Sequence, residues 1–159
     1  MLIGGMKTMM KMYLPFGDWS GDGHKQWDKV LIEAPSMEHL LNAQKEIRAR
    51  YGENFFDYFA HDYEDAGLGE IVWQALEDLY YPIERLREKD DCNDWTDSTS
   101  LKECRGYSFS IDVIIDTFIW LLNAYGAQIT VLDDTEDIPM ICNWTCPSFK
   151  TVGYGCYWS

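Results

Sequence analysis

The chain has 159 residues, of which 47% are hydrophobic and 15% aromatic, with 27 acidic and 13 basic side chains and a net charge of -14 at neutral pH. This length suits one domain, 1–159, and the apolar fraction is large enough to bury a core, which excludes general disorder and a second full domain. The most apolar stretch, 111–122, is too short to cross a bilayer and contains two aspartates, which excludes membrane insertion.

The N-terminus and the cysteines indicate the compartment. The first residues lack the apolar core and cleavage site of a signal peptide, so we interpret 1–9 as a loose leader. Cys142 and Cys146 have the loosest spacing of a zinc-ligand pair, but neither a second pair nor a nearby histidine completes a site. We therefore expect five free thiols, a cytoplasmic location and no metal or cofactor.

Two extended segments, 12–16 and 27–33, flank a glycine-rich connection and predict an antiparallel hairpin. Pro15 cannot donate a ladder hydrogen bond, so the first strand is expected at a sheet edge or beside a bulge. Residues 18–24 have the oxygen spacing of half a calcium loop, but the twelfth position, which requires a glutamate, is Lys29. A tight turn is therefore predicted rather than a calcium site.

Apolar residues at helical spacing predict a helix that Ser36 caps and Gly52 ends. Residues 53–68 are aromatic and acidic, and predict a short helix or an ordered loop. The pattern over 69–80 predicts a second helix, with a restart after Pro82 over 83–89. The apolar side of this second helix is expected to hold Val72, Trp73, Leu76, Leu79 and Tyr80.

The segment 89–105 is polar and without periodicity, which predicts a long exposed loop. A very apolar helix follows over 111–124, opened by Ser110 and ended by Gly126. Asp112, Asp116 and Asn123 are expected to form one polar stripe along it.

Three strands, 128–132, 139–144 and 150–158, are separated by turn signals and predict a C-terminal meander. Together with the hairpin it predicts an α+β fold, a single antiparallel sheet packed against about three to four helices. Sheet edges at both ends of the chain leave room for a homodimer.

Charge is concentrated in the middle of the chain. Residues 1–52 hold 7 basic and 6 acidic side chains, residues 53–104 hold 4 and 15, and residues 105–159 hold 2 and 6. Nine aromatic residues lie from Tyr51 to Tyr81, at the start of this middle segment and within it. This concentration indicates an acidic face, beyond what solubility requires.

Carboxylates at helical spacing stand about 5–6 Å apart, a distance that can imitate the phosphates of a nucleic-acid strand. Such a face would attract a basic, nucleic-acid-handling protein and repel nucleic acid itself, while nearby aromatics anchor the complex. The predicted partner-binding residues are Asp57, Tyr58, Asp62, Tyr63, Glu64, Asp65, Glu70, Glu77 and Asp78.

The sequence therefore predicts a protein-binding inhibitor that mimics nucleic-acid charge, of the anti-restriction or anti-CRISPR type found in phages and mobile elements. An immunity protein that neutralises a nuclease toxin is the alternative in the same class. A small metal-dependent enzyme is the alternative in another class, because His61 lies among four carboxylates, Asp57, Asp62, Glu64 and Asp65. The chain contains no nucleophile elbow and no phosphate-binding loop, so no catalytic residue is assigned.

Overall fold

The computed structural model describes residues 9–18, 25–58, 68–89, 99–105 and 111–132, apart from the side chains of 15–18, 25–29, 57–58 and 111. These residues form one three-stranded antiparallel sheet and five α-helices, so the predicted α+β class is confirmed. The strands of the meander predicted beyond residue 132 lie outside the described residues.

The sheet has the order β1-β2-β3. β1 (Met10–Asp18) and β2 (Lys25–Ala34) form the predicted hairpin, with a register shift between Phe16 and Gly17, next to Pro15. β3 (Thr130–Leu132) pairs with the other side of β2, which confirms that the two ends of the described chain share one sheet. Adjacent residues Leu31 and Ile32 are both buried, so both faces of the sheet are shielded from solvent there.

α1 (Met37–Tyr51) begins and ends where the sequence predicts. The Ser36 hydroxyl accepts a hydrogen bond from the His39 amide at 3.3 Å. Gly52 ends the helix with φ +117°, and its amide N–H donates a hydrogen bond to the Arg48 carbonyl at 2.8 Å. The buried residues of α1 recur at i, i+3, i+4 and i+7, which is the pattern of a helix with one face on the core; they are Leu40, Ala43, Gln44 and Ile47.

The segment 53–68 forms a short 3-10 helix, η2 (Phe55–Tyr58), and its remainder from 59 to 67 lies outside the described residues. Phe55 and Phe56 are buried, and the Phe56 ring packs edge to face on Phe118 with centroids 5.6 Å apart. These aromatics of the acidic segment therefore belong to the core rather than to an interface.

α2 (Glu70–Asp78) and α3 (Ile83–Lys89) are separated by a turn before Pro82, as predicted. A short helix, α4 (Leu101–Cys104), stands within the segment predicted as a long loop, and Leu101 and Cys104 are both buried. The sequence signal for this helix is local: Ser100 and Glu103 have the spacing of a capping box, and the structure shows that they form one.

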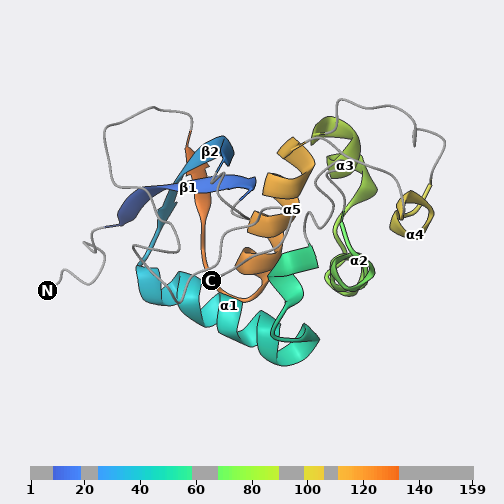
Figure 1. The fold of residues 1–159 in the computed structure, drawn as a ribbon, viewed down its shortest axis with the longest axis horizontal. Helices are drawn as coiled ribbons and strands as arrows, with labels where there is room; N and C mark the ends of the chain where they lie inside the picture. The colour runs from blue at the N-terminus through green and yellow to red at the C-terminus, as the bar shows by residue number, and fades with distance from the viewer. Residues whose placement is uncertain (1–8, 19–24, 59–67, 90–98, 106–110, 133–159) are drawn as a thin grey trace, which may run out of the picture.

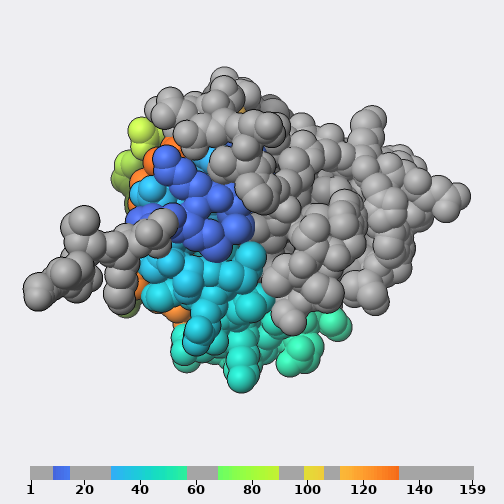
Figure 2. Space-filling model, turned by 90° about the vertical axis from the view of Figure 1, so that its left-hand side faces the viewer, coloured from blue at the N-terminus to red at the C-terminus, as the bar shows by residue number. Residues whose placement is uncertain are grey.

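α5 (Ile111–Ala124) lies at the centre of the molecule, between the sheet and the pair α2 and α3, with α1 beneath (Figure 1). It is buried on nearly all sides, as its apolar sequence requires. In Figure 2 the surfaces of β1 and α1 adjoin on the left-hand side of the molecule. No helix in the described part of the chain is long and apolar enough to cross a membrane.

The turn after α5 delays the next strand by two residues relative to the prediction. Gly126 and Gln128 have φ +93° and +58°, and the side chain of Asn123 bridges the turn by accepting from the Ile129 amide at 2.6 Å and donating to its carbonyl at 3.0 Å. A residue in the left-handed region cannot continue a strand, so β3 begins at Thr130.

Candidate functional site

Three of the predicted partner-binding residues, Glu70, Glu77 and Asp78, lie on the outer side of α2, away from its buried residues. A separation of seven or eight residues corresponds to two helical turns and keeps the three carboxylates on one side of the helix. The side chain of Glu70 is 77% exposed and that of Glu77 is 31% exposed.

Arg105, just after α4, forms hydrogen bonds and ion pairs with two of these carboxylates, those of Glu70 and Glu77. Its Nη1 donates to Glu70 Oε2 at 2.6 Å, and its Nε donates to Glu77 Oε2 at 3.1 Å, with Nη2 donating to the same oxygen. The hydrogen bonds with Glu77 raise the pKa of the Arg105 guanidinium above its ordinary value. This fork neutralises part of the acidic face from within the chain and ties α4 to α2.

Asp78 is also engaged within the chain. Its Oδ2 accepts a hydrogen bond from the Tyr51 hydroxyl at 2.9 Å, and its Oδ1 accepts from Gln74 Nε2 at 3.0 Å. Burial raises the pKa of Tyr51 to about 12, and the bond with Asp78 adds to this shift, because ionised Tyr51 would face a carboxylate. The pair links the C-terminal ends of α1 and α2.

The side chains of the other six predicted site residues lie outside the described part of the structure. Asp57 and Tyr58 lie in η2, with side chains outside the described part of the structure, and residues 59–67 are not described. Four predicted site residues fall in that range: Asp62, Tyr63, Glu64 and Asp65. Of the nine residues, the structure therefore brings together only the three carboxylates of α2.

Charge is divided unevenly between the region that contains α2, α3 and α4 and three other stretches of the chain. Residues 68–89 and 99–105, which contain α2, α3 and α4, hold six acidic and five basic side chains. In contrast, the sequence stretches 53–67, 90–98 and 133–149 hold five, four and four acidic residues and no lysine or arginine. We call these three the cation-free acidic stretches, because their sequences contain no lysine or arginine; at the start of the first stretch, Glu53 Oε2 lies 3.9 Å from Arg48 Nε.

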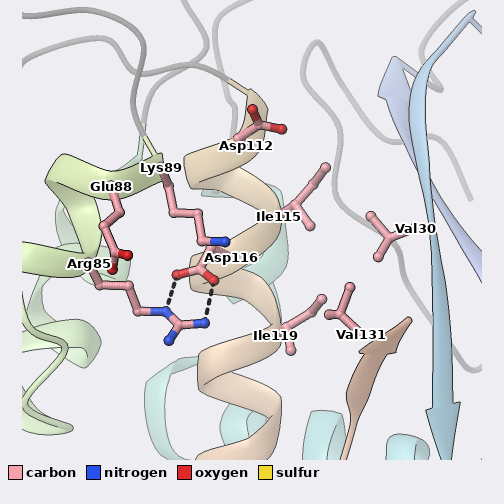
Figure 3. Close-up of a pocket in the computed structure, with 9 residues that line it drawn as sticks. All are labelled: Val30, Arg85, Glu88, Lys89, Asp112, Ile115, Asp116, Ile119 and Val131. Atoms are coloured by element: carbon pink, nitrogen blue, oxygen red, sulfur yellow. Dashed lines mark hydrogen bonds and ion pairs between the residues drawn. The ribbon is translucent and has the colours of Figure 1, made fainter. Parts of the chain in front are cut away.

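A hollow of about 490 Å³ lies between α5, α3 and the sheet (Figure 3). Its aliphatic side chains come from α5 and from strands β2 and β3, and its charged side chains come from α3 and α5. The lining residues are Val30, Arg85, Glu88, Lys89, Asp112, Ile115, Asp116, Ile119 and Val131.

The charged end of this hollow is an ordered ion pair between α3 and α5. Arg85 Nε donates to Asp116 Oδ2 at 2.6 Å and Arg85 Nη2 donates to Asp116 Oδ1 at 2.7 Å, while the guanidinium lies 5.5 Å from the Trp120 ring centroid. The Tyr81 hydroxyl donates to Asp116 Oδ2 at 2.6 Å. Burial and the neighbouring carboxylate together raise the pKa of Tyr81 far above its ordinary value.

This arrangement corrects the predicted polar stripe on α5. Asp112 is exposed, but the side chain of Asp116 is only 9% exposed. The prediction was wrong because an arginine and a tyrosine more than thirty residues earlier supply the hydrogen bonds that make burial of a carboxylate tolerable.

Tyr80 departs from its prediction in the opposite sense. Its side chain is 87% exposed, and its backbone has φ +57°, so it lies outside α2 instead of on its apolar side. Its amide donates to the Glu77 carbonyl at 3.2 Å, and the Tyr81 amide donates to the Leu76 carbonyl at 2.9 Å. These bonds end the helix in a left-handed turn, which helical spacing alone does not reveal.

Among the described residues, no group of three or more histidine, cysteine, aspartate or glutamate side chains is placed to hold a metal ion. His39 lies 2.8 Å from the Ser36 hydroxyl, at the start of α1. His61 with its surrounding carboxylates, and the turn at 19–24, lie outside the described residues, so the structure does not test the metal-dependent alternative.

Comparisons with a collection of protein-family models, with curated proteins and with solved structures find no match to this chain.

Proposed function

We propose that the protein is an acidic binding module that blocks a basic, nucleic-acid-handling protein by presenting carboxylates in place of phosphates, in the manner of anti-restriction or anti-CRISPR inhibitors. The supporting observation is the division of charge: the carboxylates of α2 are engaged by Arg105, Tyr51 and Gln74, whereas the cation-free acidic stretches hold thirteen acidic residues with no lysine or arginine among them.

This division of charge along the chain indicates which residues a basic partner would contact. A carboxylate that already accepts hydrogen bonds from the chain's own guanidinium has less to gain from a partner's arginine. Thirteen acidic residues without an interspersed lysine or arginine give these stretches a high density of negative charge, which would attract a basic partner. We therefore propose that the main partner contact is on 53–67 and 90–98, which precede α2 and follow α3 in the sequence, and that Glu70 and Glu77 have a mainly internal role.

The proposal is tested by displacement of DNA. Purified restriction endonucleases, CRISPR effectors and nuclease toxins are each bound to labelled DNA, and this protein is titrated in while fluorescence anisotropy reports the bound fraction. We expect the protein to displace DNA from at least one of these nucleases or effectors at low salt. The displacement should weaken by about tenfold or more at 200 mM salt, because exposed charges are screened beyond roughly 10 Å. Failure to displace DNA from any member at 50 mM salt would contradict the proposal.

Two sets of substitutions locate the contact. D90N, D91N, D94N and D97N together remove the four negative charges of the stretch 90–98 and should weaken displacement by about tenfold or more. The matched control is E70Q with E77Q, whose carboxylates face Arg105, and its effect should stay below about threefold. A larger effect of the control would return the interface to α2.

A further inference from the structure

Tyr80 is the most exposed large hydrophobic side chain in the described part of the chain, at 87% compared with 50% for Val131 and 38% for Met9. A single exposed aromatic residue is not unusual on a protein surface. Tyr80 differs from such a residue because its backbone is unfavourable as well.

The backbone of Tyr80 has φ +57°, a conformation in which glycine is comfortable and a side chain with a Cβ is strained. The residue stands just after the end of α2, where the Tyr81 amide reaches back to the Leu76 carbonyl at 2.9 Å, and glycine is the usual occupant of this position. Tyrosine at this position therefore strains the fold and buries almost nothing. Strained and exposed residues of this kind gather at functional sites.

The surroundings of Tyr80 suit protein binding. The preceding residue, Leu79, lines a shallow hollow of about 390 Å³ together with Trp120 and Ala124, and with Arg85 and Asn123 at its polar side. Arg85 is fixed there by Asp116 and by the Trp120 ring, so it needs no ordering on binding. The hollow is lined by tryptophan and arginine and begins at the residue before Tyr80, and these three residue types dominate binding energy at protein interfaces.

We propose that Tyr80 is the apolar anchor of a protein-binding surface formed by the Tyr80 side chain and the adjacent hollow, and that its occupant is a basic protein. Glu84, an exposed residue in the first turn of α3, lies four residues after Tyr80, and the chain as a whole carries a charge of -14, which repels a second copy and attracts a cationic surface. The basic character of the occupant rests on the proposed function, whereas the anchoring role of Tyr80 rests on its exposure and backbone.

The substitution Tyr80→Gly separates binding from folding. We expect it to raise the Tm by roughly 2–4 °C, because it relieves the left-handed strain and removes almost no buried area, and to weaken DNA displacement by about tenfold or more. Val131→Ala, which shortens an exposed apolar side chain on β3 instead, is the matched control and should leave displacement unchanged. A lower Tm for Tyr80→Gly, or unchanged displacement, would overturn the anchoring role.

If this protein displaces DNA from none of the restriction endonucleases, CRISPR effectors or nuclease toxins, photocrosslinking still tests whether Tyr80 binds a protein. Benzoylphenylalanine is placed at position 80 and, as a control, at exposed position 46 on α1. An adduct formed only at position 80 and suppressed by excess unlabelled protein, but not by excess Tyr80→Gly protein, supports the anchor. A basic protein in that adduct supports both proposals, a neutral or acidic one retains the anchor and rejects the proposed function, and no specific adduct rejects the anchor.

Discussion

The Asp116 carboxylate shows how one residue can decide the position of two helices. It accepts three hydrogen bonds, two from Arg85 and one from Tyr81, while its side chain remains almost excluded from solvent. A carboxylate in such a place is tolerable only because its lone pairs are occupied. The three residues thus fix α3 and the turn before it against α5.

Asp116→Asn should therefore destabilise the protein strongly. The amide retains the volume of the side chain but removes the charge that Arg85 faces, and we expect a loss of about 2–3 kcal/mol in the free energy of unfolding, reduced from the fully buried case because Arg85 is partly exposed. Urea denaturation measures the difference. The control is Asp112→Asn, on the same helix but exposed, which should change stability by less than about 0.5 kcal/mol. Equal effects of the two substitutions would show that the ion pair contributes nothing.

At the scale of elements, α4 depends on a contact outside itself. A four-residue helix cannot be stable alone, because its nucleation cost exceeds what one turn returns. The capping box of Ser100 and Glu103 helps, as does the burial of Leu101, and Arg105 then fastens its end to α2.

Arg105→Ala should release α4 without unfolding the molecule. The arginine is partly shielded while Glu70 is exposed, so we expect a loss of about 1 kcal/mol and faster amide hydrogen exchange confined to residues 100–105. Lys102→Ala, an exposed position on the same helix, serves as the control and should leave exchange unchanged. Unchanged exchange in Arg105→Ala would mean that burial of Leu101 and Cys104 alone holds the helix.

The elements that the sequence predicts well are those whose signals are local. Ser36 and Gly52 mark the ends of α1 within a residue, and the apolar run of α5 fixes its length. Tyr80 was misplaced because helical spacing continues through the left-handed turn, and Gln128 was misplaced for a similar reason. The pairing of Arg105 with Glu70 spans 35 residues, and the pairing of Tyr81 with Asp116 also spans 35, so neither can be read before the helices are packed. The sequence therefore predicted Glu70, Glu77 and Asp78 as free for a partner, because their internal partners Arg105 and Tyr51 lie far away in the chain.

At the scale of the whole molecule, two tyrosine–carboxylate pairs connect helices that are far apart in the chain. Tyr51 with Asp78 joins α1 to α2, and Tyr81 with Asp116 joins the turn before α3 to α5. In both pairs the tyrosine keeps its proton more tightly in the folded state than in the unfolded state, where the pKa is 10.0.

Alkaline pH should therefore loosen the entire fold. A pKa that is higher in the folded state means that stability is complete below pH 10 and declines as the pH rises toward the folded value, which is about 12 for Tyr51. Urea denaturation at pH 9, 10 and 11 should show a falling free energy of unfolding, and Tyr51→Phe should make that fall shallower. If Tyr51→Phe and Tyr81→Phe both retain the full pH dependence, the tyrosine–carboxylate pairs are not its cause.

The central position of α5 has a consequence for how the chain folds. The helix contacts α1, α2 and α3, yet it follows all three in the sequence. During synthesis the apolar faces of these earlier helices emerge before the helix that covers them, and their pairing must wait until residue 124 has left the ribosome. Contacts between segments so far apart slow folding. The nascent chain therefore passes through a stage in which Leu40, Phe56 and Leu76 have no α5 to pack against. Electrostatic repulsion between the acidic residues of different nascent chains opposes their association during this stage.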